Sequence, residues 1–135
     1  MAGLLALDPP DGVRAMPYAT LNGVIDDPHR TVYLERIDLE GGYKALHVSH
    51  AHRLVFVDTT FRYGAGEGLS AISVDEVLAF RTTAEANAWD GLAYTFVSHV
   101  LEVDCAGRDN GRDGSNIDNG STVHTGGVVI RLGGD

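Results

Sequence analysis

A polar run of Gly, Asn, Asp and Ser residues lies between two hydrophobic segments near the end of the sequence, from Cys105 to Thr125. Such a run has almost no apolar surface to bury, so it cannot form a core element unaided. We therefore predict a polar Gly/Asn/Asp loop over residues 105–125, held in place by a partner surface or by bound ions. Its Asn and Asp residues are expected to supply turn conformations.

The length and the charge of the chain limit what it can be. Its 135 residues fit one domain that buries a core of its own. Its formal net charge of −9 repels phosphate backbones and anionic bilayers, so we expect neither nucleic acid nor membrane as a partner. Cys105 is the single cysteine, which excludes an intrachain disulfide and fits a reducing compartment or a particle assembled inside a cell.

The first twelve residues are predicted to form an N-terminal arm, and residues 13–135 a single β-rich domain. Leu4, Leu5 and Leu7 make the arm apolar, and they are expected to dock against a neighbouring subunit. The arm has no basic start typical of a signal peptide. No stretch reaches the roughly 20 apolar residues of a membrane span. The expected location is therefore a virion or the cytoplasm.

Alternating apolar and polar residues predict several short strands separated by Gly, Asn and Asp turns. The alternation is clear over residues 30–39, and residues 54–60, within an extended run over 53–60, are the most β-prone stretch of the chain. No internal repeat is evident. Evenly spaced short strands favour a mainly β fold, an antiparallel β-sandwich or barrel-like domain with one or two short helices.

Residues 83–103 are compatible with two structures. In the first, a short helix over 84–89 is followed by a strand over 94–103, and Asp90-Gly91 is the break between them. In the second, a longer helix spans 83–103 and the fold is α+β. Gly91 and the β-forming residues after it favour the first. Trp89 is expected to lie in the core in either case.

Three histidines within six residues, His47, His50 and His52, form the main candidate metal site. Imidazoles are common ligands of transition metals. On an extended segment His50 and His52 point the same way and His47 points to the opposite face, so further ligands have to come from elsewhere. The competing interpretation is a polar turn with half-exposed histidines.

A second candidate site lies in the polar run, where Asp109, Asp113 and Asp118 could bind a cation through oxygen ligands. Gly111 and Gly120 occupy positions at which an EF-hand needs ligands, so an EF-hand is excluded. Simple turn residues are the alternative explanation for these aspartates.

No nucleophile or acid–base pattern points to catalysis, so we expect a non-enzymatic protein. The first hypothesis is a structural or assembly subunit that forms a homo-oligomer or a larger assembly, concretely a virus-particle protein of the capsid-decoration, head–tail or tail type, with no cofactor. The first alternative is a small metal-binding protein or metal-dependent enzyme that holds a divalent metal at His47, His50 and His52. The second alternative is an acidic module that binds protein or carbohydrate, with Trp89 and the tyrosines as contact platforms.

Overall fold

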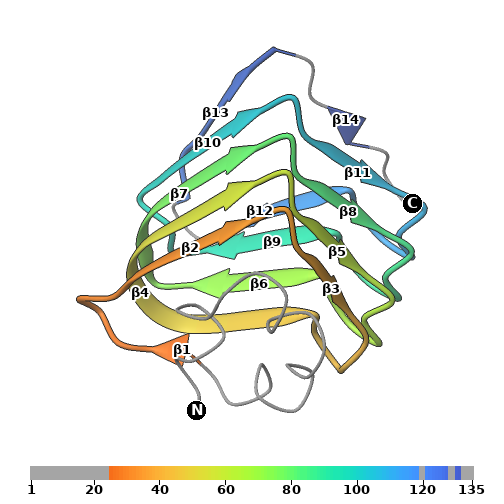
Figure 1. The fold of residues 1–135 in the computed structure, drawn as a ribbon, viewed down its shortest axis with the longest axis horizontal. Helices are drawn as coiled ribbons and strands as arrows, with labels where there is room; N and C mark the ends of the chain where they lie inside the picture. Colours follow the sequence, from red (N-terminus) through yellow and green to blue (C-terminus); the bar gives the residue numbers. More distant parts are fainter. Residues whose placement is uncertain (1–24, 119–120, 128–129, 132–135) are drawn as a thin grey trace.

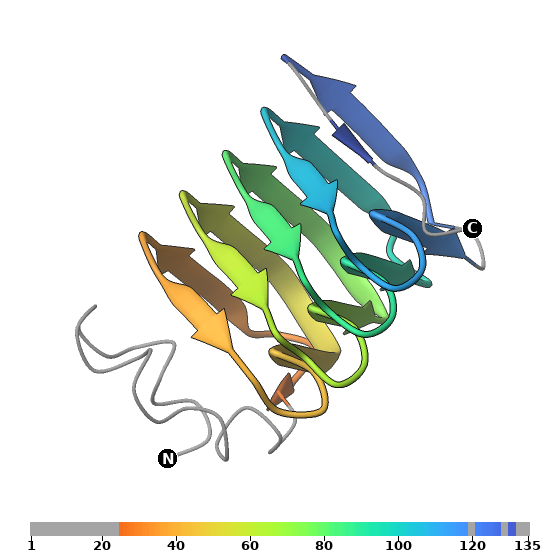
Figure 2. The ribbon, with the colours of Figure 1, turned by 90° about the vertical axis from the view of Figure 1, so that its right-hand side faces the viewer.

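The computed structural model describes residues 25–118, 121–127 and 130–131. Every strand pairing in these segments is parallel. The chain winds into a β-solenoid, a stack of coils that have one strand on each of three sides (Figure 1). Seen from the side, the strands of successive coils lie one behind another (Figure 2).

Three parallel sheets form the sides of the solenoid, and the long strand β4 (Leu46–Val57) belongs to two of them because it runs through a corner. Sheet A holds the first part of β4 with β1 (Ile25–Asp26), β6 (Leu69–Ile72), β9 (Leu92–Thr95) and β12 (Ser115–Asp118). Sheet B holds the second part of β4 with β2 (Thr31–Glu35), β7 (Val74–Phe80), β10 (His99–Val103) and β13 (Val123–Gly126). Sheet C consists of β3 (Asp38–Glu40), β5 (Thr60–Arg62), β8 (Thr83–Glu85), β11 (Ala106–Arg108) and β14 (Ile130–Arg131).

The sequence repeats with the coil, so the expectation that it holds no internal repeat is wrong. Val32 pairs with Leu54, Leu54 with Val77 and Val77 with Val100, and these partners are 22 or 23 positions apart. Equivalent residues share size and polarity more than identity. The repeat is therefore a repeat of hydrophobic pattern, as expected for a solenoid whose coils stack on one another.

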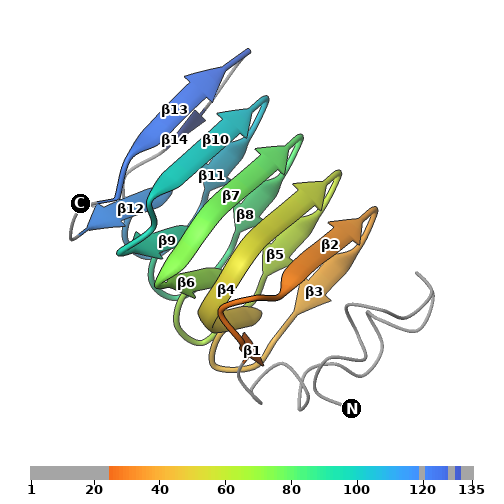
Figure 3. The same ribbon diagram turned by 90° about the vertical axis from the view of Figure 1, so that its left-hand side faces the viewer.

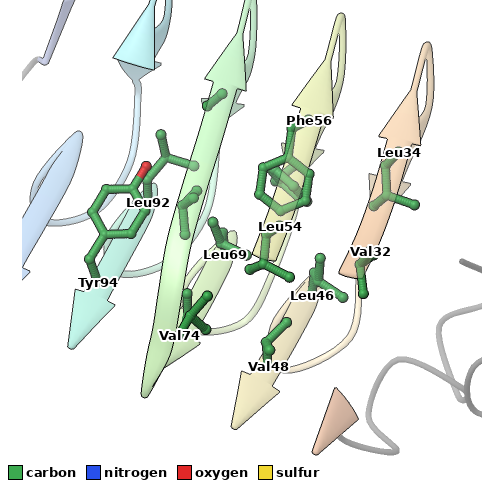
Figure 4. Packing of buried hydrophobic residues seen from close by; sticks show 14 of the residues in the cluster. Val32, Leu34, Leu46, Val48, Leu54, Phe56, Leu69, Val74, Leu92 and Tyr94 are labelled. Carbon is green, nitrogen blue, oxygen red and sulfur yellow. The ribbon is translucent and has the colours of Figure 1, made fainter. Parts of the chain in front are cut away.

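Side chains from all three sheets fill the interior of the solenoid (Figure 4). Phe56 of sheet B and Phe61 of sheet C are fully buried, and their rings meet edge to face with 5.1 Å between centroids. Two coils further on, Tyr94 and Glu102 occupy the interior, where the tyrosine hydroxyl donates a 2.6 Å hydrogen bond to the Glu102 carboxylate. The hydrogen bond lowers the cost of burying the polar ends of both side chains.

The corner between sheets B and C is a tight turn with the same backbone geometry in successive coils. Asp58, Arg81 and Asp104 occupy equivalent places in it, with left-handed φ angles of 50°, 48° and 56°. Arg81 donates from Nε to Asp58 Oδ1 at 2.6 Å, and this hydrogen bond lowers the pKa of the Asp58 carboxyl. Charges of opposite sign thus stack along this corner.

At another corner, between sheets C and A, the buried side chains of Asn87 and Asn110 form a ladder of hydrogen bonds. The side chain of Asn87 accepts from Gly64 N at 2.9 Å and donates to Phe61 O at 3.2 Å and to Asn110 Oδ1 at 2.9 Å. Asn110 in turn donates to Ala84 O at 3.1 Å. The two amides therefore join successive coils where the backbone turns and strand pairing is interrupted.

The antiparallel β-sandwich or barrel that the sequence predicts is wrong, because the strands pair in parallel in a β-solenoid. Alternation of apolar and polar residues marks a half-buried strand but gives no information about the direction of its neighbour. The short helix over 84–89 and the longer helix over 83–103 are also wrong, since the described part of the chain forms no helix. Residues 84–103 instead hold the end of β8, β9 and β10, and residues 105–125 hold β11, β12 and the start of β13.

Candidate ligand site at Asp90

Polar side chains stack along the turn that leads from sheet C into sheet A. Lys44, Glu67, Asp90 and Asp113 follow one another at the spacing of the coil. Backbone hydrogen bonds hold the successive turns in register, from Gly68 N to Asp90 O at 3.0 Å and from Gly91 N to Asp113 O at 2.8 Å. The turn therefore places one cation and three carboxyl groups along one edge of the solenoid.

A second row of side chains lies beside this edge on sheet A. His47, Ser70, Ala93 and Asn116 are paired in register along the sheet. Lys44 Nζ lies 3.3 Å from Ser70 Oγ and 3.6 Å from Glu67 Oε1, so the lysine joins the two rows near the N-terminal end. The two rows are thus linked by polar contacts within the protein.

A cavity of about 300 Å³ lies at the C-terminal end of the two rows, lined by Asp90, Gly111, Arg112, Asp113 and Asn116. Asp90 is only 4% exposed, and its carboxylate accepts from Asp113 N at 3.1 Å and from Asn116 Nδ2 at 3.1 Å. These two bonds fix the orientation of the carboxylate. The cavity combines carboxylate acceptors with amide and guanidinium donors.

Two aromatic rings lie along the same turn, and Arg112, which lines the cavity, lies over one of them. Trp89 and Tyr43 meet edge to face with 5.6 Å between ring centroids. They can meet across an intervening coil because Gly66 stands between them, and a Cβ at Gly66 would lie 3.2 Å from the Tyr43 ring. The Arg112 guanidinium lies 5.6 Å from the centroid of Trp89. Trp89 is 40% exposed and does not lie in the core, contrary to the expectation from the sequence.

The three histidines of the predicted metal site do not meet, although all lie on β4. His50 Nδ1 lies 2.7 Å from Asp26 Oδ1, and His52 Nδ1 lies 3.0 Å from Asp75 Oδ2. His47 lies beside Ser70 in sheet A. Within residues 25–118, 121–127 and 130–131, no group of three metal-ligating side chains is assembled. Metal binding by this cluster stays a prediction.

The aspartates of the second predicted site lie at three different places in the last coils. Asp109 has a left-handed φ of 56° in the turn after β11, Asp113 lines the cavity, and Asp118 ends β12. Only Asp113 thus contributes to the cavity. Leu4, Leu5 and Leu7, the predicted interaction residues of the arm, lie outside the described residues.

The environment of His47 predicts a dependence of stability on pH. Burial, followed by the positive charge of Lys44, lowers the pKa of His47 from its ordinary value of 6.5. Between that value and the lower folded pKa, the unfolded chain binds more protons than the folded one. The free energy of unfolding should therefore fall as the pH decreases through this window, and this contribution should stay constant above about pH 6.5.

Urea unfolding of the wild type and of His47→Gln at about pH 8 and about pH 5 measures this contribution. We expect a smaller acid-induced loss in the variant than in the wild type. His99→Gln, which removes an exposed imidazole elsewhere, is the control. An equal loss in the wild type and in His47→Gln would contradict the assignment.

Comparison with protein-family models, with curated proteins and with solved structures found no match. In the described segments of the chain, no helix is long and apolar enough to span a membrane.

Proposed function

We propose that the protein is a carbohydrate-binding module that holds a neutral glycan at the Asp90 cavity and against the Trp89 ring. The observation that carries this proposal is the exposed indole of Trp89, which Arg112 connects to a cavity lined by charged and amide side chains. A sugar ring offers hydroxyl groups that both donate and accept hydrogen bonds, together with a face of C–H groups. Carboxylates, amides and guanidinium groups match the hydroxyls, and an exposed aromatic ring matches the apolar face.

Charge supports a neutral ligand over an anionic one. Glu67, Asp90 and Asp113 lie along the turn that borders the cavity, and the chain as a whole carries a formal charge of −9. A polyanion such as a uronic-acid polymer would approach against this field. Protein pockets that bind apolar small molecules are lined mostly by hydrocarbon groups. The lining of this cavity is too polar for such a ligand.

Trp89 provides a direct test because it is the only tryptophan of the chain. We expect its fluorescence to change saturably when gluco-, manno- or xylo-oligosaccharides are added, and an oligogalacturonate is the anionic comparison. Calorimetry with the glycan that responds best should show that Trp89→Ala weakens binding at least tenfold, about 1.4 kcal/mol. Trp89→Phe should keep most of the affinity because it keeps an aromatic face.

Phe96→Ala is the matched control, since Phe96 is an exposed aromatic residue outside the cavity. It should bind as the wild type does. The proposal fails if no neutral glycan gives a saturable signal, or if Trp89→Ala binds as tightly as the wild type.

The assembly subunit, and with it the virus-particle protein, stays a prediction of the sequence. The leucines on which that prediction depends lie outside the described residues. Binding of a glycan needs no reaction, so the proposal agrees with the expectation of a non-enzymatic protein. It corresponds to the acidic binding module that the sequence offered as its second alternative.

A further inference from the structure

The outer face of sheet B is apolar, although a solenoid needs apolar residues only on the inner face. Six partly exposed side chains form this face: Val55, Val57, Leu78, Phe80, Leu101 and Val103. They alternate with buried residues on β4, β7 and β10, which lie side by side in Figure 3. Parallel strands with apolar residues on both faces are typical of sheets that are covered on both sides.

Charges of alternating sign border this face on both sides. On the side toward sheet A, Arg53 of β4 is followed one coil later by Glu76 of β7, and the two side chains are 2.6 Å apart. On the side toward sheet C, Asp58 is followed by Arg81. If a second copy faces this one with its coils running in the opposite order, each positive charge on either border therefore meets a negative one.

We propose that a second copy of this chain covers the outer face of sheet B, related by a twofold axis that is parallel to the strands and runs between β4 and β7. In this arrangement β4 of each copy faces β7 of the other. Arg53 of one copy then faces Glu76 of the other, and Asp58 faces Arg81. Unlike charges meet at every one of these positions, and the apolar side chains pack between them.

The shape of the face supports the same symmetry. Tyr33 of β2 is 50% exposed, and a cavity of about 290 Å³ is lined by Glu76, Leu78, His99, Val100, Leu101 and His124. The twofold axis brings β2 of one copy against β10 of the other, so Tyr33 lies opposite Leu101, at the hollow.

A twofold axis along the solenoid also pairs unlike charges, Arg53 with Asp58 and Glu76 with Arg81. It places Tyr33 opposite Glu35, however, so the exposed tyrosine does not reach the hollow, whose Leu78 and Leu101 then face Phe80 and Val103. The arrangement with antiparallel solenoid axes is therefore the one we infer.

The area of the face indicates weak association. Five residues along each of four strands cover about 17 Å by about 19 Å. This is less than the roughly 800 Å² per partner of a standard stable interface. The dimer should therefore form in a concentration-dependent manner, and sedimentation of the full chain has to cover a wide concentration range.

Sedimentation of Leu78→Lys tests the surface, because it places a charge at the centre of the face. We expect the wild type to shift from monomer to dimer with concentration and Leu78→Lys to stay monomeric with unchanged circular dichroism. Leu101→Lys is a second disruptive variant in case the first does not fold. Phe96→Lys, which introduces the same charge at an exposed aromatic residue off this face, should dimerise as the wild type does. A wild type that is monomeric throughout, or a folded Leu78→Lys that still dimerises, would overturn the proposal.

Cross-linking through introduced cysteines tests the symmetry. The one native cysteine, Cys105, is buried and should not react. A mixture of Tyr33→Cys and Leu101→Cys proteins should join to each other through a short bis-maleimide. Tyr33→Cys alone should not, because the two copies of residue 33 lie at opposite ends of the face. Efficient cross-linking of Tyr33→Cys to itself would exclude this axis. The dimer shares no residue with the Asp90 cavity, so its failure and that of glycan binding are separate results.

Discussion

Replacing Asn87 by alanine is expected to lower the free energy of unfolding by about 3 to 5 kcal/mol, because several buried groups lose their partners at once. Asn87 is 2% exposed, and its side chain bonds the backbone of Gly64 and Phe61 and the side chain of Asn110. Water has little access to a corner this buried. Each group left unsatisfied there costs about 1 to 3 kcal/mol.

Urea unfolding at neutral pH measures the loss, and two further variants separate its causes. Asn87→Asp keeps the volume but replaces the amide donor with an acceptor facing Phe61 O and Asn110 Oδ1, so it should be about as damaging as alanine. Asn116→Ala removes the same atoms from a less buried place with one hydrogen bond, to Asp90. We expect it to cost under about 1.5 kcal/mol. Equal losses in Asn87→Ala and Asn116→Ala would show that the ladder does not hold the corner.

Some strands of this fold could be predicted from the sequence, but others, such as β8, β11 and β12, and the direction of all of them could not. The alternation of Val32 and Leu34 with polar residues correctly predicts β2, and the β-branched run before Asp58 correctly predicts the second part of β4. The same alternation occurs in an antiparallel hairpin and in one side of a parallel solenoid. The Gly, Asn and Asp residues between the strands form hairpin turns in an antiparallel fold and the corners of the coils in a solenoid.

The signal that distinguishes the two folds is a repeat that is weak in identity. Asn87 and Asp90-Gly91 recur one coil later as Asn110 and Asp113-Gly114. The asparagines form the buried ladder, and the Asp-Gly pairs form the turn into sheet A. The first of these copies is compatible with a helix end and the second with a polar loop. Each copy alone fits such an assignment, and only their comparison reveals the coil.

The candidate site was the least predictable part, since it depends on residues from different coils. Trp89 was expected in the core because tryptophan is mostly buried, yet the turn directs it outward next to Arg112. His47, His50 and His52 are close in sequence, but the bend of β4 separates them and gives His50 and His52 carboxylate partners of their own. The cavity is marked instead by the 23-residue spacing between Asp90 and Asp113, which is the spacing of the coil.

Gly107 is a position where a single methyl group is expected to destabilise the fold. It lies in β11, and a Cβ there would lie 2.5 Å from the carbonyl oxygen and 2.6 Å from the Cα of Gly114. Equivalent positions in earlier coils hold Phe61 and Ala84, so the side chain at this position becomes smaller toward the C-terminal end. Both contacts at Gly107 are backbone atoms that cannot rotate away. Gly107→Ala should therefore lower the free energy of unfolding by about 2 to 3 kcal/mol.

Gly126 provides a matched control for this substitution. It also lies in a strand, β13, and a Cβ there meets only a Val103 methyl group at 3.5 Å, an ordinary contact. Gly126→Ala should be neutral, or stabilising by up to about 1 kcal/mol, because alanine restricts the unfolded chain more than glycine does. Thermal and urea unfolding of both variants compare the two sites. If Gly107→Ala is as stable as Gly126→Ala, the close approach of β11 to Gly114 is not a property of the folded protein.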